Sequence, residues 1–272
     1  RPSGENTMER WSRHTSGRAR GQASCPARVL RRRLNAHRSR NDDATVRQKT
    51  GERPAWEIPM LKKIREDLWE TRGESPFPGL TTHAYLWTPR SGGNVLFYST
   101  VTDADFDEIE RLGGVAHQYL SHHDEAGPMV REIARRFGAR LHAGRGDAER
   151  IGQVVENGVW LHRRQVDENG VEIIPTPGHT PGSTCYQVSG AHGQRYLFTG
   201  DTIYAERDGS WAAGNLPFSD PDALASSLEL IASLRPDVVA SSAAPGGVGV
   251  HDLHDGDDWA GRVRGALASL GR

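Results

Sequence analysis

Three short stretches of this 272-residue chain place imidazole and carboxylate side chains where predicted strands give way to turns. They are His122-His123-Asp124-Glu125, Pro177-Gly178-His179-Thr180-Pro181-Gly182 and Thr199-Gly200-Asp201. Strand ends hold side chains rigidly and leave them open to solvent, and neutral imidazole and carboxylate groups bind zinc, iron or manganese. The sequence therefore predicts a divalent-metal site built from loops, with the candidate ligands His122, Asp124, Glu125, His179 and Asp201.

The candidates differ in how specific their context is. The signal is strongest for His179, because two Pro-Gly pairs force tight turns on both sides of it. His122 could instead make a structural hydrogen bond, and Asp124 could cap the helix that follows or position a water molecule. Glu125 suits the first turn of that helix on dipole grounds alone. Asp201 is either a ligand or a turn-former, and the clustering of ligand types favours ligation.

Other residues near these stretches have two interpretations each. His123 alternates away from its neighbour along the loop, which predicts an exposed or outer position. His83, in the first predicted strand of the body, could replace a lost ligand, although such a histidine is more often packed. Trp87, Trp211 and Phe218 could line an apolar substrate pocket or belong to the core.

Together the three stretches resemble the signature of the metallo-β-lactamase-fold hydrolases: a His-x-His-x-Asp-His loop, a Gly-His loop, a strand-ending Asp and a late His. Aligning Asp124 with the family's Asp places His122 on the second histidine. His179 then matches the Gly-His histidine, and Asp201 matches the bridging carboxylate. The resemblance covers roughly residues 76–245. It implies an α+β fold, the αββα four-layer sandwich, and a divalent metal, with zinc expected ahead of iron or manganese.

The chain departs from that signature at three positions. Leu120 stands where the first histidine belongs, Glu125 replaces the fourth ligand, and Ala243 falls where the late histidine would be. The pattern resembles a divergent branch with an altered metal-binding loop. We expect about one metal ion per chain, because only two imidazoles of the signature remain.

The resemblance implies a hydrolase that acts on a small-molecule ester, thioester, lactone or phosphoester. A divalent ion held by His122, His179 and a carboxylate would lower the pKa of water from about 15.7 toward about 7. Asp124 is the expected catalytic residue, orienting the attacking water or accepting its proton. A glyoxalase-type thioesterase carries an additional helical region, and the roughly 70 residues after Asp201 are few for that role.

Functions of two other classes compete with hydrolysis. The first is a binding module that has lost catalysis, because Leu120, Glu125 and Ala243 replace expected ligands. The second is nucleic-acid binding through a basic N-terminal segment, which we disfavour and which would fall steeply with salt.

The first 55 residues differ from the rest in charge. They hold 14 of the 34 Lys and Arg and 5 of the 35 Asp and Glu, which leaves 20 basic against 30 acidic residues in the remainder. Their apolar residues are few and without period, so the segment cannot bury enough surface to offset its ordering entropy. We predict a disordered basic extension over residues 1–58 that the metallo-β-lactamase-like domain, residues 59–272, does not need. Met60 would make a natural beginning.

Composition is that of one globular body plus a tail. No run approaches the roughly 18 apolar residues of a membrane span, which predicts a soluble protein without membrane contact. Cys25 and Cys185 lie far apart in unlike contexts. They argue against a disulfide framework and predict a reducing, cytoplasmic location.

From Met60 onward the pattern predicts alternating strands and helices. Apolar runs at 82–87 and 94–98 indicate a hairpin. Strands are further expected at 115–120, 139–143, 184–188 and 196–198, with two more over 159–174 around an Asn169-Gly170 turn. Helices are expected at 103–112 with Thr102 as cap, at 130–137, along the stripe Leu224, Leu228, Ile231 and Leu234, and at 257–270.

Overall fold

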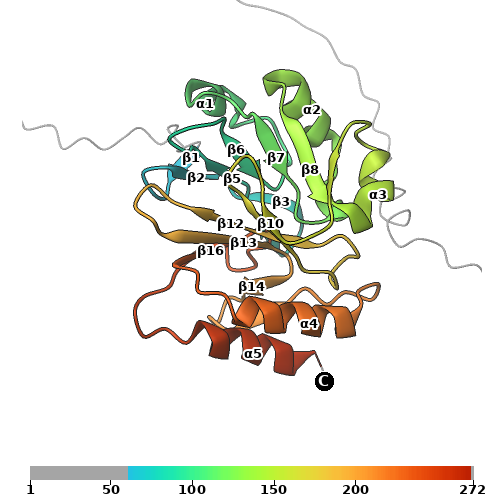
Figure 1. The fold of residues 1–272 in the computed structure, drawn as a ribbon, viewed down its shortest axis with the longest axis vertical. Coiled ribbons are helices and arrows are strands. Elements are labelled where there is room, and N and C mark those ends of the chain that lie inside the picture. Colours follow the sequence, from blue (N-terminus) through green and yellow to red (C-terminus); the bar gives the residue numbers. More distant parts are fainter. Residues whose placement is uncertain (1–60, 271–272) are drawn as a thin grey trace, which may run out of the picture. The chain divides into compact units, whose positions relative to one another are not determined.

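Two β-sheets lie face to face in the computed structural model of this chain, which describes residues 61–270 (Figure 1). The helices form the outer layers: α1 (Phe106–Arg111), α2 (Pro128–Phe137) and α3 (Ala148–Gly152) on the first sheet, α4 (Pro221–Ala232) and α5 (Trp259–Ser269) on the second. The predicted αββα sandwich is confirmed. The predicted basic extension lies outside the described residues.

The first sheet has seven strands, in the order β1 (Leu61–Lys63), β2 (Leu68–Thr71), β5 (Tyr85–Trp87), β6 (Val95–Phe97), β7 (His117–Tyr119), β8 (Arg140–Gly144) and β9 (Val159–Leu161). The pairs β6–β7, β7–β8 and β8–β9 are parallel. Parallel neighbours need crossover connections, and α1 and α2 supply the first two. The carboxyl ends of these strands therefore meet at one edge of the sheet.

The second sheet has six strands, in the order β10 (Gln165–Val166), β11 (Glu172–Pro175), β12 (Thr184–Ser189), β13 (Arg195–Gly200), β16 (Val238–Ser241) and β17 (Val250–Asp252). Only β13 and β16 pair in parallel, and their register shifts between Phe198 and Gly200. Gly200 has a φ of +55°, and a Cβ there would lie 2.1 Å from the hydroxyl of Ser121. Glycine is needed on both counts, and the chain turns at the residue before Asp201.

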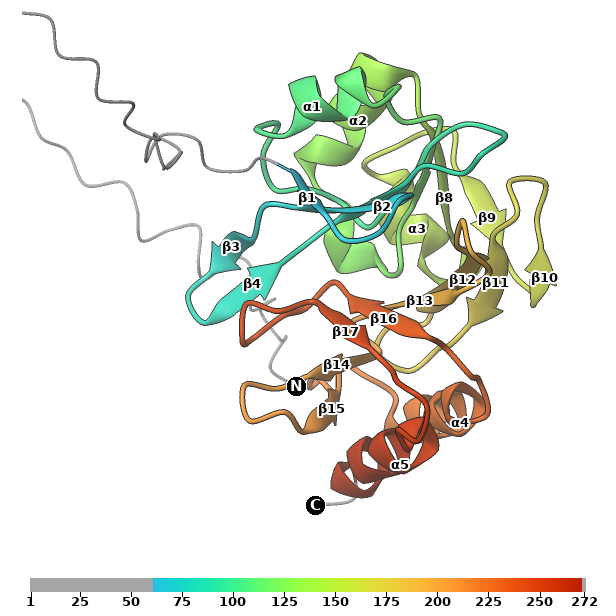
Figure 2. The same ribbon diagram turned by 90° about the vertical axis from the view of Figure 1, so that its left-hand side faces the viewer.

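Two small hairpins lie along one edge of the sandwich (Figure 2). One is β3 (Glu74–Phe77) with β4 (Leu80–Thr82), and the other is β14 (Ile203–Ala205) with β15 (Trp211–Ala213). Thr82 forms an isolated bridge with Ala243, so the first hairpin is tied to the loop that follows β16. This edge is where the predicted site residues lie.

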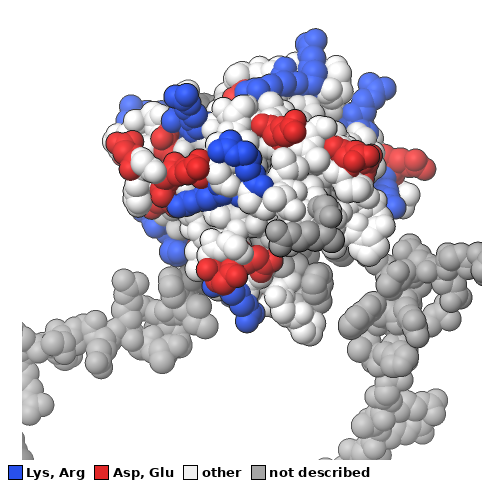
Figure 3. Space-filling view, turned by 90° about the horizontal axis from the view of Figure 1, so that it is seen from below, with Lys and Arg blue, Asp and Glu red and all other residues white. Residues whose placement is uncertain are grey.

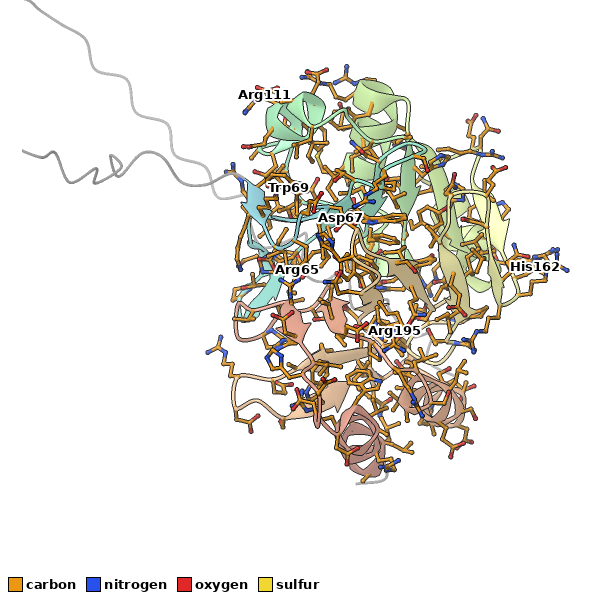
Figure 4. The ribbon with its side chains drawn as sticks, turned by 60° about the vertical axis from the view of Figure 1, so that its left-hand side comes forward. Arg65, Asp67, Trp69, Arg111, His162 and Arg195 are labelled. Atoms are coloured by element: carbon orange, nitrogen blue, oxygen red, sulfur yellow. The ribbon has the colours of Figure 1, made fainter. Side chains whose placement is uncertain are left out.

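Aromatic side chains and one buried carboxylate join the two sheets. Phe97 of β6 stacks on Phe198 of β13 with 3.8 Å between ring centroids. Asp67, just before β2, accepts hydrogen bonds from Trp87 Nε1 at 3.1 Å and from the Tyr196 hydroxyl at 3.0 Å (Figure 4). Two donors on opposite sheets compensate the burial of this carboxylate. The contacts fix the spacing of the sheets, and with it the edge that carries the site.

Most predicted elements are present. The strands at 82–87 and 94–98 correspond to the antiparallel pair β5–β6, and the Asn169-Gly170 turn joins β10 to β11 with Gly170 at a φ of +79°. The assignment of 159–174 to two strands is wrong, because β9 joins the first sheet and only 165–175 form the hairpin. Helix α1 begins at Phe106 without a Thr102 cap, since the hydroxyl and the N–H of Thr102 both bind Glu74.

The described surface carries both signs of charge. Seen from the α5 side, basic and acidic side chains are interspersed rather than gathered by sign (Figure 3). Among residues 61–270, no helix is both long and apolar enough to cross a membrane.

Candidate metal centre

The three predicted stretches converge at the edge where β7, β11 and β13 end. One possible ligand atom from each of His122, Asp124 and His179 lies within 4.8 Å of the other two. Asp201 Oδ2 lies 3.7 Å from His122 Nε2. The structure thus brings four of the five predicted ligands into one place, and their binding of a metal stays a prediction.

His179 is oriented by a backbone oxygen. Its Nδ1 lies 2.7 Å from the carbonyl oxygen of Gly214, so Nδ1 carries the proton and Nε2 keeps its lone pair. Nε2 is buried and has no hydrogen-bond partner. Burial and the neighbouring His122 lower the pKa of His179 and keep its imidazole neutral. A buried, unpartnered nitrogen beside a second imidazole and a carboxylate fits a metal ligand.

Gly214 cannot carry a side chain without disturbing this arrangement. A Cβ there would lie 2.1 Å from the backbone oxygen of Asp201 and 2.8 Å from Nδ1 of His179. On the other side of the turn, Gly178 has a φ of +138°, and a Cβ there would lie 2.3 Å from the backbone of Leu224 in α4. These two glycines therefore let the His179 loop pack tightly.

Ser121 and Glu125 both lie against Nδ1 of His122. Its Nδ1 lies 2.8 Å from the Ser121 hydroxyl and 3.3 Å from Glu125 Oε1, so Nε2 is the atom that faces Asp201. Burial disfavours the imidazolium, but the carboxylates of Glu125 and Asp201 outweigh burial and raise the pKa of His122 to about 10. A metal ion would displace this proton on binding.

Glu125 lies on the Nδ1 side of His122. Its carboxylate accepts the Ser121 N–H at 2.8 Å and the Ser121 hydroxyl at 2.6 Å. It is not in the group of ligand atoms around His179. The structure therefore places Glu125 beside His122, on the Nδ1 side of the ring, where it also binds Ser121, and its role as a metal ligand stays a prediction.

Leu120 and Ala243, the two aliphatic residues at positions where the signature has histidines, have different surroundings. Leu120 is fully buried and belongs to the apolar cluster that contains Val130 and Leu141. Ala243 lies beside Asp201 and donates its N–H to Oδ1 at 3.0 Å. Ala243, which stands where the family has its late histidine, thus contacts the site through its backbone N–H.

A buried carboxylate that was not predicted from the sequence joins the two histidine loops. Asp147 accepts hydrogen bonds from the His123 N–H at 3.0 Å, the Thr180 hydroxyl at 2.6 Å and the Gly182 N–H at 3.0 Å. Its position before α3 would suggest an N-cap, but its side chain makes no capping hydrogen bond. No local signal marks its actual role.

His123 is buried, so its expected exposure is wrong. Its ring nitrogens lie 3.1 Å from Asp147 Oδ1 and 3.4 Å from Asp124 Oδ1. Arg150 also lies 2.8 Å from Nε2. His123 therefore links the buried Asp147 to Asp124, the predicted catalytic residue, whose side chain is 38% exposed.

A cavity of about 300 Å³ opens beside His122, Asp124 and His179. Phe218 lies near it, with its ring 6.4 Å from that of His179. Trp87 is buried in the core and Trp211 packs on Trp259, so neither lines the cavity.

His83 also lies outside the cavity. It is buried with Nδ1 3.1 Å from the backbone oxygen of Thr71, which agrees with a packed histidine rather than a replacement ligand.

The sequence identifies the family. Residues 104–242 match the protein-family model described as the Metallo-beta-lactamase superfamily, which is half of the chain, and the chain belongs to that superfamily. The hydroxyacylglutathione hydrolase of Acidiphilium cryptum (strain JF-5) is 28% identical over 160 residues, 57% of this chain and 61% of that protein. The hydroxyacylglutathione hydrolase of Fuscovulum blasticum is 29% identical over 136 residues, 50% and 48%. The chain thus spans about half to three fifths of these relatives.

Solved structures show the same fold. A metallo-beta-lactamase from Pontibacter korlensis is 17% identical, with a TM-score of 0.59 over 78% of this chain and 98% of that one. An archaeal metallo-beta-lactamase superfamily protein from Sulfolobus tokodaii is 17% identical, with a TM-score of 0.55 over 76% and 86%. At this identity the likeness supports the sandwich and not an activity.

We expect the protein, reconstituted under reducing conditions, to hold about one divalent transition metal per chain. His122 and His179 would supply the nitrogens and the neighbouring carboxylates the oxygens. Elemental analysis after incubation with zinc, iron(II) or manganese and removal of free metal measures the ratio. A ratio near two would contradict the expectation, and a ratio near zero for all three metals would favour a binding module without catalysis.

Proposed function

We propose that this protein is a metal-dependent hydrolase of small molecules that carry an ester, thioester, lactone or phosphoester. One observation carries the proposal: the buried, unpartnered Nε2 of His179 lies beside His122 and Asp124 at the wall of a cavity. When bound there, a divalent cation, with zinc expected first, supplies a Lewis acid and a more acidic water. The likeness to hydroxyacylglutathione hydrolases supports a thioester among the candidate substrates.

Each residue of the site has its own role in this proposal. His122 and His179 hold the metal, and the hydrogen bonds at their Nδ1 atoms fix which nitrogen faces it. Asp124 borders the cavity and is partly open to solvent, so it can orient the attacking water and accept its proton. Asp201 faces His122 Nε2 and completes the ligand set.

Glu125 acts in this proposal as a positioning residue. Its carboxylate faces the Nδ1 side of His122, and a carboxylate behind a ligand histidine fixes the ring and raises its basicity. In this proposal the positioning role takes the place of the direct metal ligation predicted for Glu125 from the sequence.

Asp124→Asn is expected to keep most of the metal but lose turnover by roughly 10²–10⁴-fold, the range that a positioned general base contributes. The amide retains the shape of the side chain but cannot accept a proton in the same way. Metal content and initial rates on a panel of thioesters, lactones and phosphoesters are measured together.

Asp255→Asn, at an exposed carboxylate outside the cavity, is the matched control and should behave like the wild type. If Asp124→Asn is as active as the wild type on every responsive substrate, Asp124 is not the catalytic residue. If the metal-loaded wild type hydrolyses nothing on the panel, the non-catalytic binding module becomes the better explanation.

A further inference from the structure

The cavity beside the candidate metal ligands has an apolar wall. Among the described residues that line it are Pro76, Leu80, Val101, Met129 and Leu216. They come from the β3–β4 hairpin, from the segment after β6, from α2 and from the loop before α4. Elements far apart in the sequence thus present aliphatic side chains to one space.

Apart from His122, the charged side chains of this lining are acidic. Asp124, Glu125 and Asp201 border the cavity, and no Lys or Arg does among the residues that the structure describes. One divalent cation would offset only part of this negative charge. A carboxylate on the substrate would leave water for a space where no Lys or Arg of the described residues can pair with it, which costs free energy.

Exposed apolar side chains mark the mouth of the cavity. Val101 is 45% exposed, Leu216 41% and Phe218 56%, and they are three of the five large hydrophobic side chains that are exposed in residues 61–270. The other two are Val166, on β10, and Val248. Val101 and Leu216 line the cavity and Phe218 lies near His179, and exposed apolar side chains beside a pocket are typical of a binding site.

The loop that carries Leu216 is fixed to the metal centre. The Ser219 hydroxyl accepts the Leu216 N–H at 2.9 Å and donates to the His179 backbone oxygen at 2.9 Å. Gly214, at the start of the same loop, accepts from Nδ1 of His179. The apolar wall is therefore held beside the reacting position and forms part of the site.

We infer that the cavity selects substrates with a short, uncharged apolar acyl chain and discriminates against acyl groups that carry a carboxylate. The inference rests on the proposed hydrolase function and names its substrate class.

In the reaction, water adds to the acyl carbon, the bond to the leaving oxygen or sulfur breaks, and a carboxylic acid and an alcohol or thiol are released. At about 30 Å³ per water-sized group the cavity holds roughly ten non-hydrogen atoms, so the acyl group lies inside and a larger leaving group extends outward.

Hydrolysis of a matched pair of esters tests the selection. p-Nitrophenyl butyrate and p-nitrophenyl hemisuccinate share the leaving group and nearly the same acyl length, and they differ by a terminal methyl against a carboxylate. The full-length, metal-loaded protein is expected to hydrolyse the butyrate with a kcat/KM at least about tenfold higher. Equal values, or a preference for the hemisuccinate, would overturn the substrate class.

A cation placed in the wall should weaken the discrimination. Leu216→Lys is expected to raise the hemisuccinate-to-butyrate ratio of kcat/KM about fivefold, because one unit charge a few ångströms from the carboxylate has roughly this effect in a hydrated site. Val166→Lys adds the same charge at an exposed valine outside the cavity and should leave the ratio unchanged. An equal rise in both variants would show that net charge, rather than the cavity, governs the preference.

Binding separates the substrate class from the proposed function. Ligand-observed NMR with hexanamide and with its carboxylate-ended counterpart, adipic acid monoamide, reports occupancy without turnover. Binding of hexanamide alone, weakened by Leu216→Lys, supports the inference even if neither ester is hydrolysed, and in that case only the hydrolase function fails. Equal binding of both amides, or binding of neither, overturns the inference whatever the ester rates are.

Discussion

Replacing His179 by Ala is expected to remove bound metal and turnover together. Nε2 of His179 is a buried nitrogen without a hydrogen-bond partner, and its loss leaves His122 as the one imidazole in the group of ligand atoms that the described residues form. Removing an outer hydrogen-bond partner of a metal ligand costs roughly 10–100-fold in affinity or activity, so loss of a direct ligand should exceed about 100-fold. Metal content by elemental analysis and kcat/KM on the best substrate of the panel are measured on the same preparations.

His162→Ala is the matched control for this experiment. His162 is exposed in the loop after β9 and lies outside the cavity (Figure 4). It should keep both metal and activity. If His179→Ala matches the wild type on every responsive substrate, the metallohydrolase proposal is withdrawn. If it loses activity but keeps its metal, His179 acts on the substrate and does not bind the ion.

Asp147→Ala is expected to lower the free energy of unfolding by about 3–5 kcal/mol, the cost of breaking a buried charged network. The substitution leaves the N–H groups of His123 and Gly182 and the hydroxyl of Thr180 without their acceptor. For a domain of this size the melting temperature should fall by roughly 10 °C. Asp208→Ala, at an exposed carboxylate that also accepts hydrogen bonds, should melt like the wild type.

The pH dependence of this stability has a definite sign. Burial alone would raise the pKa of Asp147, but hydrogen bonds from His123, Thr180 and Gly182 outweigh it and hold the pKa below its usual value. A lowered pKa in the folded state stabilises the protein above the unfolded pKa and ceases to do so as the pH falls through the folded value. The difference in melting temperature between wild type and Asp147→Ala should therefore shrink below about pH 4. A difference that is constant down to pH 3 would contradict this assignment.

The features that the sequence predicts best are those that a few neighbouring residues determine. The Pro-Gly pairs around His179 specify their turns within six residues, and Gly200 specifies the bend before Asp201. The αββα sandwich follows from the family resemblance, while strand and helix periods indicate only the alternation of the elements. The turns at His179 and Gly200 could be located in the sequence because each depends on neighbours in the chain.

The features that were missed depend on distant residues or on a change of local conformation. Asp147 binds partners 24 to 35 positions away, and no period or motif records such contacts. The exposure predicted for His123 assumed extended backbone, but residues 123–125 form a 3₁₀ turn that directs the ring inward. Periodicity identifies a strand at 159–161 but cannot tell which sheet it joins.

The loop from Gly214 to Ser219 serves two purposes at once. Its first carbonyl sets the tautomer of His179, and its Leu216 side chain forms part of the cavity wall. A change of this loop that fits a different acyl group is therefore expected to alter how firmly His179 is held as well. We expect substitutions that change the substrate range elsewhere in the cavity wall, in the β3–β4 hairpin and at Met129. Changes there leave the hydrogen bonds of Gly214 and Ser219 to His179 in place.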